Sequence, residues 1–114
     1  MPFIQTRITS KLSTAEKDSL RAQFLKIIGE ELNKPAGYIM IGIEDGYALS
    51  LGESLLEKGA MISVQHMGVP DKQAYQAITK RMSLELEKAL GIRSECIYIT
   101  FQCINDWGWS GQLL

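Results

Sequence analysis

Residues 13–43 read STAEKDSLRAQFLKIIGEELNKPAGYIMIGI and hold the pattern that decides the fold. Ser13, with Glu16 three residues later, forms a capping box that predicts the start of a helix. Apolar residues then recur at every fourth position, and further on they alternate as they do in a β-strand. The helical set is Leu20, Phe24, Ile28 and Leu32, and the strand set is Ile39, Ile41 and Ile43.

The same pattern occurs again 58 residues further along the chain. Asp71 takes the place of Ser13 as a helix cap, and Pro70 before it excludes an earlier helical start. The matching apolar residues are Ile78, Met82, Leu86 and Leu90, followed by Ile97, Ile99 and Phe101. We therefore predict one domain of residues 1–114 that contains an internal repeat of residues 2–45 and 60–103.

Each half of the repeat predicts the order strand, helix, strand. The helices are expected at residues 14–33 and 72–90, and the strands at residues 3–8, 38–44, 60–67 and 96–103. Parallel strands that are joined by a helix cross over right-handedly, which places both helices on one face of the sheet. The predicted fold is α/β, a tandem βαβ repeat that forms a four-stranded sheet with two helices on one face.

The second strand predicts that the other face of the sheet is also covered. Residues 38–43 are apolar at nearly every position, which is typical of a strand buried on both faces. Two helices cover only one face, and no further element is predicted. We therefore expect a second copy of the chain to cover the other face in a closed symmetric oligomer.

Composition excludes several classes of function. The net charge is −1 and no basic cluster is present, so we expect no nucleic-acid partner. No apolar run approaches the roughly 20 residues of a membrane helix, and no secretory signal is apparent, so a cytoplasmic protein is expected. Only one histidine is present, and the two cysteines, Cys96 and Cys103, have neither metal nor redox spacing. We expect no metal and no cofactor.

Pro2 is the residue whose chemistry stands out. Removal of Met1 would give a chain that begins with a free prolyl secondary amine. An α-amine titrates near ~7.7–8.0, and burial or a neighbouring cation lowers its pKa further. Such an amine is a suitable general base at neutral pH. The alternative is that Met1-Pro2 merely starts the chain.

Five stretches in order carry a resemblance to a known family. They are residues 1–4 (MPFI), 33–39 (NKPAGYI), 66–68 (HMG), 97–99 (IYI) and 107–109 (WGW). With them the whole chain resembles the macrophage migration inhibitory factor family of the tautomerase superfamily. The resemblance implies a homotrimer of sheets around a central channel, with active sites between neighbouring subunits. It also implies tautomerisation of phenylpyruvate-like 2-keto acids and, in several animal members, a secreted signalling role.

The resemblance also implies roles for single residues. Pro2 is the catalytic base, Lys34 binds the substrate carboxylate, and the backbone N–H of Met67 contacts a substrate oxygen. The expected lining of the pocket for the aromatic ring is Tyr38, Tyr98, Trp107 and Trp109, with Thr100 at the ring end of the substrate. Two plainer interpretations stay open: Lys34 as a cation that favours a helix C-terminus, and tryptophans that are simply buried.

Three departures from the vertebrate factor are visible. Thr100 stands in place of an asparagine and offers one proton instead of two, so substrate preference is expected to differ. Trp107 replaces a smaller aliphatic residue, which narrows the pocket. Gly59 and Ile62 occupy the places of the cysteines of a C-x-x-C motif, so thiol–disulfide activity is not expected.

Two other functions remain as alternatives. One is a signalling or binding protein of the same family with a vestigial pocket, able to leave cells without a signal peptide and to bind a receptor that the sequence does not identify. The other is hydration or dehalogenation of small unsaturated acids, for which relatives place arginines around the prolyl amine. None of the four arginines, Arg7, Arg21, Arg81 and Arg93, stands at an obviously matching position.

Overall fold

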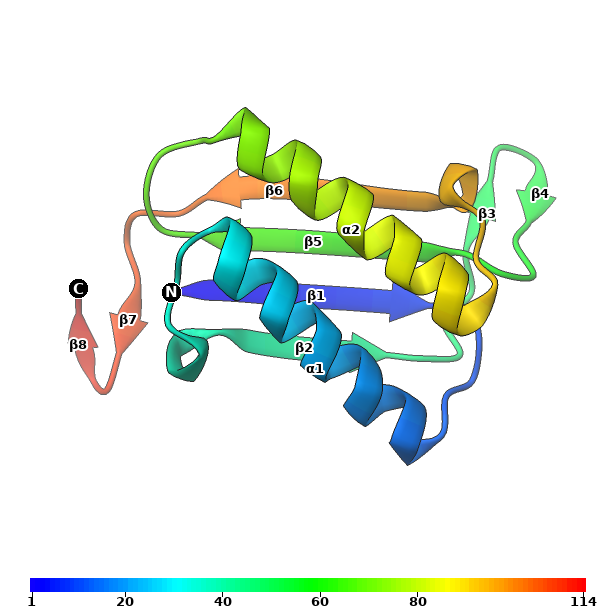
Figure 1. Cartoon of the computed structure of the whole chain (residues 1–114), viewed down its shortest axis with the longest axis horizontal. Coiled ribbons are helices and arrows are strands. Elements are labelled where there is room, and N and C mark those ends of the chain that lie inside the picture. Colours follow the sequence, from blue (N-terminus) through cyan, green and yellow to red (C-terminus); the bar gives the residue numbers. More distant parts are fainter.

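Four long strands form one mixed sheet in a computed structural model that describes residues 1–114 (Figure 1). The spatial order is β2-β1-β5-β6, with bounds β1 Pro2–Ile8, β2 Met40–Glu44, β5 Ala60–His66 and β6 Ile97–Cys103. β1 is parallel to β2, β5 is parallel to β6, and the central pair β1–β5 is antiparallel. Each half of the chain therefore contributes one parallel pair, and the predicted fold class is confirmed.

The two helices begin where their caps predict. The side chain of Ser13 accepts the N–H of Glu16 at the start of α1 (Thr14–Glu31), and the carboxylate of Glu16 accepts the N–H of Ser13. Asp71 accepts the N–H of Ala74 at the start of α2 (Lys72–Leu90). The predicted end of the first helix at residue 33 is wrong, because the backbone of Asn33 is left-handed, with φ 53°.

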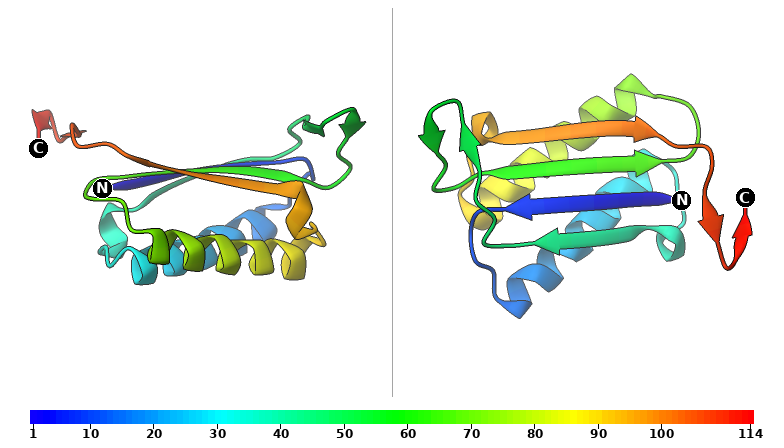
Figure 2. Two further views of the ribbon diagram at one scale, coloured as in Figure 1. Left: turned by 90° about the horizontal axis from the view of Figure 1, so that it is seen from above. Right: turned by 180° about the vertical axis from the view of Figure 1, so that it is seen from behind.

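Both helices pack on the same face of the sheet (Figure 2). Alternate residues of β1 and β5 point toward them and are buried, and the helices contribute their apolar stripes. The buried helical residues are Leu20, Phe24, Ile27 and Ile28 in α1 and Ala74, Ile78, Met82 and Leu86 in α2. Three of the four predicted positions in each helix are thus core positions.

The structure contains short elements that were not predicted, but none of them covers the other face of the sheet (Figure 2). Two short hairpins lie at opposite ends of the sheet: β3 (Ser50–Leu51) with β4 (Ser54–Leu55), and β7 (Gly108–Trp109) with β8 (Gln112–Leu113). They project beyond the strand ends and leave the helix-free face of the sheet open (Figure 2).

The predicted strands were too long at three ends. A 3₁₀ helix η1 (Ala36–Tyr38) occupies the predicted start of the second strand, and a second one, η2 (Ser94–Cys96), precedes β6. β5 ends at His66, one residue earlier than predicted, whereas β1 begins one residue earlier, at Pro2. β2 lies at an edge of the sheet, and its Met40 is 68% exposed within the single chain.

None of the helices has the length and apolar character that crossing a membrane requires. No group of three or more His, Cys, Asp or Glu side chains is placed to hold a metal ion. Both cysteines are free.

Candidate active site

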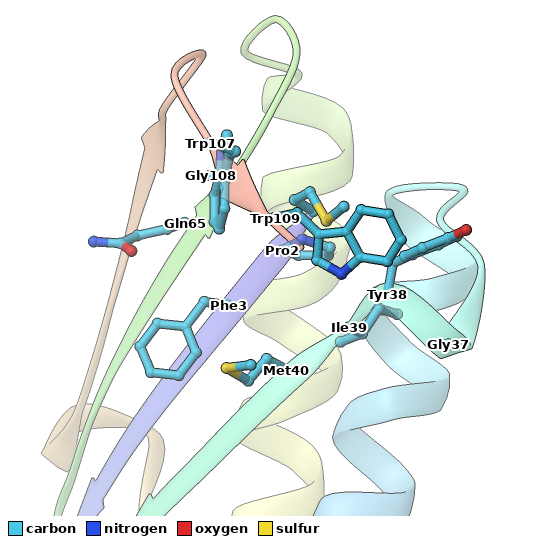
Figure 3. A pocket seen from close by; sticks show the side chains of 11 residues that line it. Pro2, Phe3, Gly37, Tyr38, Ile39, Met40, Gln65, Trp107, Gly108 and Trp109 are labelled. Atoms are coloured by element: carbon cyan, nitrogen blue, oxygen red, sulfur yellow. The ribbon is translucent and has the colours of Figure 1, made fainter. Parts of the chain in front are cut away.

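A pocket of about 470 Å³ lies where β1 begins (Figure 3). Three separate segments and one strand residue line it: residues 1–3, 37–40 and 107–109, and Gln65. Both ends of the sequence therefore meet at this site. Most of the lining is apolar or aromatic, which suits a small organic molecule with a hydrophobic part.

Pro2 enters the pocket from the first position of β1. In the sheet it pairs with His66 of β5, and its ring is fully buried. A strand tolerates proline at its first residue, where the missing N–H removes no bond from the interior of the ladder. Pro2 thus has a fixed place in the sheet while its nitrogen end borders the pocket.

The end of α1 positions Lys34. Asn33 turns the chain out of the helix, and the N–H of Lys34 donates to the carbonyl of Gly29 at 3.1 Å. Lys34 does not line the pocket, but its charge acts on the amino terminus. Burial lowers the pKa of the Met1 α-amine below its usual value, and the positive charge of Lys34 lowers it further.

Two aromatic side chains meet edge to face in one wall of the pocket. η1 presents Tyr38, and Trp109 comes from the C-terminal hairpin, with ring centroids 5.9 Å apart and planes at 78°. The hairpin turns at Ser110 and Gly111, both with positive φ (54° and 79°), as a two-residue turn between twisted strands requires. Figure 3 shows Tyr38 and Trp109 on the same side of the pocket.

The C-terminal segment is tied down by backbone groups. The indole N–H of Trp107 donates to the carbonyl of Ile104, and the N–H of Leu114 donates to the carbonyl of Trp107 at 2.8 Å. These bonds hold Trp107, and the pairing of β7 with β8 holds Trp109.

The structure brings together only part of the predicted set. Pro2, Tyr38, Trp107 and Trp109 line one pocket. Met67 follows directly after His66, the strand partner of Pro2, but its side chain does not line the pocket.

Tyr98 and Thr100 lie elsewhere in the single chain. Both project from the helix-free face of β6, as the alternation predicts, and Tyr98 is 61% exposed. The residue of β6 that is level with Pro2 is Cys103, so Tyr98 lies five residues away, or about 16 Å along the strand. Tyr98 instead borders a hollow beside the β3–β4 hairpin. A site that contains Pro2 and Tyr98 together requires a second copy of the chain.

Besides Met1, sequence reasoning missed four lining side chains: Phe3, Ile39, Met40 and Gln65. Their signal was available in part, because Phe3 and Gln65 each stand next to a buried strand residue and must face the opposite side of the sheet. The place of Met40 in the lining could not be predicted from the helical or the strand pattern, because it depends on the residue at which η1 ends.

The βαβ duplication, the mixed sheet and the pocket beside a near-terminal proline define the fold of the tautomerase superfamily. Within it, the family model described as Macrophage migration inhibitory factor (MIF) matches residues 1–114. The chain belongs to this family.

Solved structures agree with this assignment. MIF2 of Leishmania major is 28% identical, with a TM-score of 0.92, and the match covers 100% of this chain and 97% of that one. A MIF homologue from Prochlorococcus marinus is 24% identical, with a TM-score of 0.87 and 97% of both chains covered. A MIF-like protein from Entamoeba histolytica is 20% identical, with a TM-score of 0.90 and 99% and 98% covered. The last two show the fold alone. A comparison with curated protein sequences gave no match.

Proposed function

We propose that this protein is a keto–enol tautomerase that acts on phenylpyruvate-like aromatic 2-keto acids. The observation that carries the proposal is a terminal proline at the edge of a pocket of about 470 Å³ with aromatic walls. An aromatic ring on one side and a reactive amine on the other match the two ends of such a substrate.

Pro2 supplies the base once Met1 has been removed. Burial and the Lys34 charge lower the pKa of the Met1 amine, and we expect them to act in the same direction on a Pro2 amine freed by the removal of Met1. The free amine takes a proton from the carbon next to the keto group, and the substrate oxygen gains a proton to give the enol. The reverse reaction returns the proton to carbon, so the reaction requires no metal, cofactor or redox partner.

The remaining residues bind and orient the substrate. Lys34 attracts the carboxylate, and Tyr38, Trp107 and Trp109 surround the aromatic ring. The backbone N–H of Met67 contacts the substrate oxygen, where negative charge develops as the carbon loses its proton.

The proposal includes a homotrimer. Tyr98 and Thr100 are too far from Pro2 within one chain, and the helix-free face that carries them is open. A neighbouring copy packed on that face would bring Tyr98 and Thr100 to the ring end of the substrate. The proposal takes residues 1–114 as one domain with the repeat 2–45 and 60–103, and places the protein in the cytoplasm.

The experiment uses one sample for mass and activity. Intact mass spectrometry first establishes that Met1 is absent, and the interconversion of phenylpyruvate with its enol is then followed by ultraviolet absorbance. One structural neighbour, 14% identical, is described as inactivated by 2-oxo-3-pentynoate. The alkyne of this compound is conjugated to a ketone, so an amine can add to it.

Incubation of the processed protein with 2-oxo-3-pentynoate should abolish activity and add one reagent mass to the peptide that begins with Pro2. The matched control is the same protein with Met1 retained, which should be inactive and unmodified at the amino terminus. Full activity of the Met1-containing protein would contradict the role of Pro2.

A further inference from the structure

Three polar side chains that the proposed reaction does not use form a cluster beside Pro2. His66 is the last residue of β5, Cys103 is the last residue of β6, and Tyr75 lies in the first turn of α2. These three positions are at the end of the sheet where the amino terminus lies (Figure 1). In the sheet register Pro2 pairs with His66, and His66 pairs with Cys103. The His66 residue is only 3% exposed. The cluster is therefore one strand away from the proposed base.

The hydrogen bonds of the cluster form a series in which each donor is oriented toward the carbonyl of Met67. His66 Nδ1 lies 3.2 Å from the carbonyl oxygen of Met67, and because a carbonyl only accepts, Nδ1 carries the proton. In the neutral ring Nε2 is then an acceptor, and the hydroxyl of Tyr75 donates a hydrogen bond to it at 2.5 Å. The thiol of Cys103 lies 3.4 Å from the Tyr75 oxygen and 3.5 Å from Nε2.

The phenol of Tyr75 is suited to remain a donor. Burial, and next the bond with Cys103, raise the pKa of Tyr75 to about 12. Its ring is stacked on Phe101, with centroids 4.2 Å apart and planes at 14°. The hydroxyl is therefore protonated at neutral pH, and packing fixes its position.

The series of hydrogen bonds ends on the carbonyl of Met67, and the N–H of the same residue, which belongs to the preceding peptide, is free. The carbonyl of His66 accepts the N–H of Ile104 at 2.8 Å, on the β6 side. Because the peptide is planar and trans, the N–H of Met67 points the opposite way, toward β1, where Pro2 pairs with His66. That N–H makes no hydrogen bond within the chain. It is a donor without a partner on the β1 side of β5, next to the Pro2–His66 pair.

We propose that Tyr75, acting through His66, is a positioning residue that holds the Met67 peptide so that its N–H faces the substrate oxygen beside Pro2. This inference rests on the proposed tautomerase function. The Ile104 N–H holds the carbonyl before Met67, and the His66 Nδ1–H holds the carbonyl after it. Without the Tyr75 hydroxyl, Nε2 keeps only the thiol of Cys103, a weak donor at 3.5 Å, and the ring is held less firmly in its tautomer and orientation. The hydrogen bond from Nδ1 to the Met67 carbonyl is then weakened.

The test removes the hydroxyl and keeps the ring. Tyr75→Phe retains the stacking on Phe101 and should lower kcat about 10- to 100-fold, the range typical of small displacements at a catalytic site. KM should change less than about twofold, because the N–H acts most strongly where charge develops. The control is Tyr47→Phe, which removes a phenol near Arg7 at the other end of the sheet and should leave both constants unchanged.

A second pair of variants tests whether the hydrogen bonds run from Tyr75 through His66 to the Met67 carbonyl. The side-chain amide of His66→Asn offers an N–H near the place of Nδ1, so this variant should retain more kcat than His66→Leu, which offers none. The amide resonance of Met67 in an NMR spectrum gives a readout that needs no substrate. It should shift or broaden in Tyr75→Phe and stay in place in Tyr47→Phe.

Wild-type kcat in Tyr75→Phe would overturn the proposal. An equal loss in His66→Asn and His66→Leu, together with a lowered melting temperature, would also overturn it by showing that the cluster only supports the fold. If the processed wild-type protein has no tautomerase activity, the proposed function fails. In that case the amide resonance of Met67 is the only test of the positioning role, and an unchanged resonance in Tyr75→Phe would refute that role.

Discussion

Replacing Lys34 with alanine tests whether its charge serves the substrate or the helix. A hydrogen bond to a charged group contributes roughly 1.5–3 kcal/mol, and Lys34 is half-buried, so water screens part of the interaction. We therefore expect the lower end of the range, about 1.5 kcal/mol, which corresponds to about tenfold in affinity. The loss should appear in KM for phenylpyruvate and should be absent for its methyl ester, which lacks the negative charge.

The same substitution has a second signature in the pH profile. The base form of Pro2 is the active one, so kcat/KM rises as the pH passes the pKa of the amine. Lys34 lowers the pKa of the Met1 amine, and we expect its charge to disfavour the protonated Pro2 amine in the same way. Lys34→Ala should therefore move the rising limb of the profile to higher pH, and Lys34→Arg should move it back toward the wild-type position.

Lys88 provides a matched control, because it is the basic residue in the last turn of α2. A cation at a helix C-terminus contributes about 0.3–1 kcal/mol of stability, so Lys88→Ala should lower the melting temperature slightly and leave KM and the pH profile unchanged. If Lys34→Ala behaves like Lys88→Ala, or if the acid and the ester lose equally, the substrate role of Lys34 is refuted.

Three further predictions concern the base, the assembly and the fold. Pro2→Gly, with its mature terminus verified by mass, should lower kcat about 10²- to 10⁴-fold, the usual contribution of a general base; an undiminished rate would assign the proton transfer to another group. Sedimentation at micromolar concentration should give three times the chain mass. If the trimer forms, Thr100→Asn should change KM for hydroxyphenylpyruvate and leave the pH profile unchanged, whereas a stable monomer would exclude Thr100 from the site. Ser13→Ala should lower the free energy of unfolding by about 1 kcal/mol, measured by urea denaturation, because the N–H of Glu16 loses its acceptor; equal stability would show that solvent replaces the cap.

The helices were predictable because their signals are local. The capping box at Ser13 and the cap at Asp71 each lie within four residues of the group they bind. The ends of the helices were less predictable. The first helix ends at a left-handed turn that depends on the backbone conformation of Asn33 alone, and the possible conformations differ little in energy. Strands of two residues, as in β3 and β4, are too short to show any period.

The candidate site could be predicted only in part from the sequence. Pro2 and the aromatic residues are unusual enough to attract attention singly. The cluster of His66, Tyr75 and Cys103 has no linear signature, because its members come from three different elements. Alternation along β5 predicts the face on which Gln65 stands, but its place in the lining depends on the strand register, which sets it beside Phe3.

The pocket has a consequence for the newly synthesised chain. Its walls include residues 1–3 and residues 107–109, two segments at nearly the greatest separation that this sequence contains. The sheet and both helices consist of residues up to Cys103, so most of the core is translated before Trp107 and Trp109 leave the ribosome. The pocket therefore lacks one wall until synthesis has passed the final tryptophan, and the proposed activity cannot begin before that point.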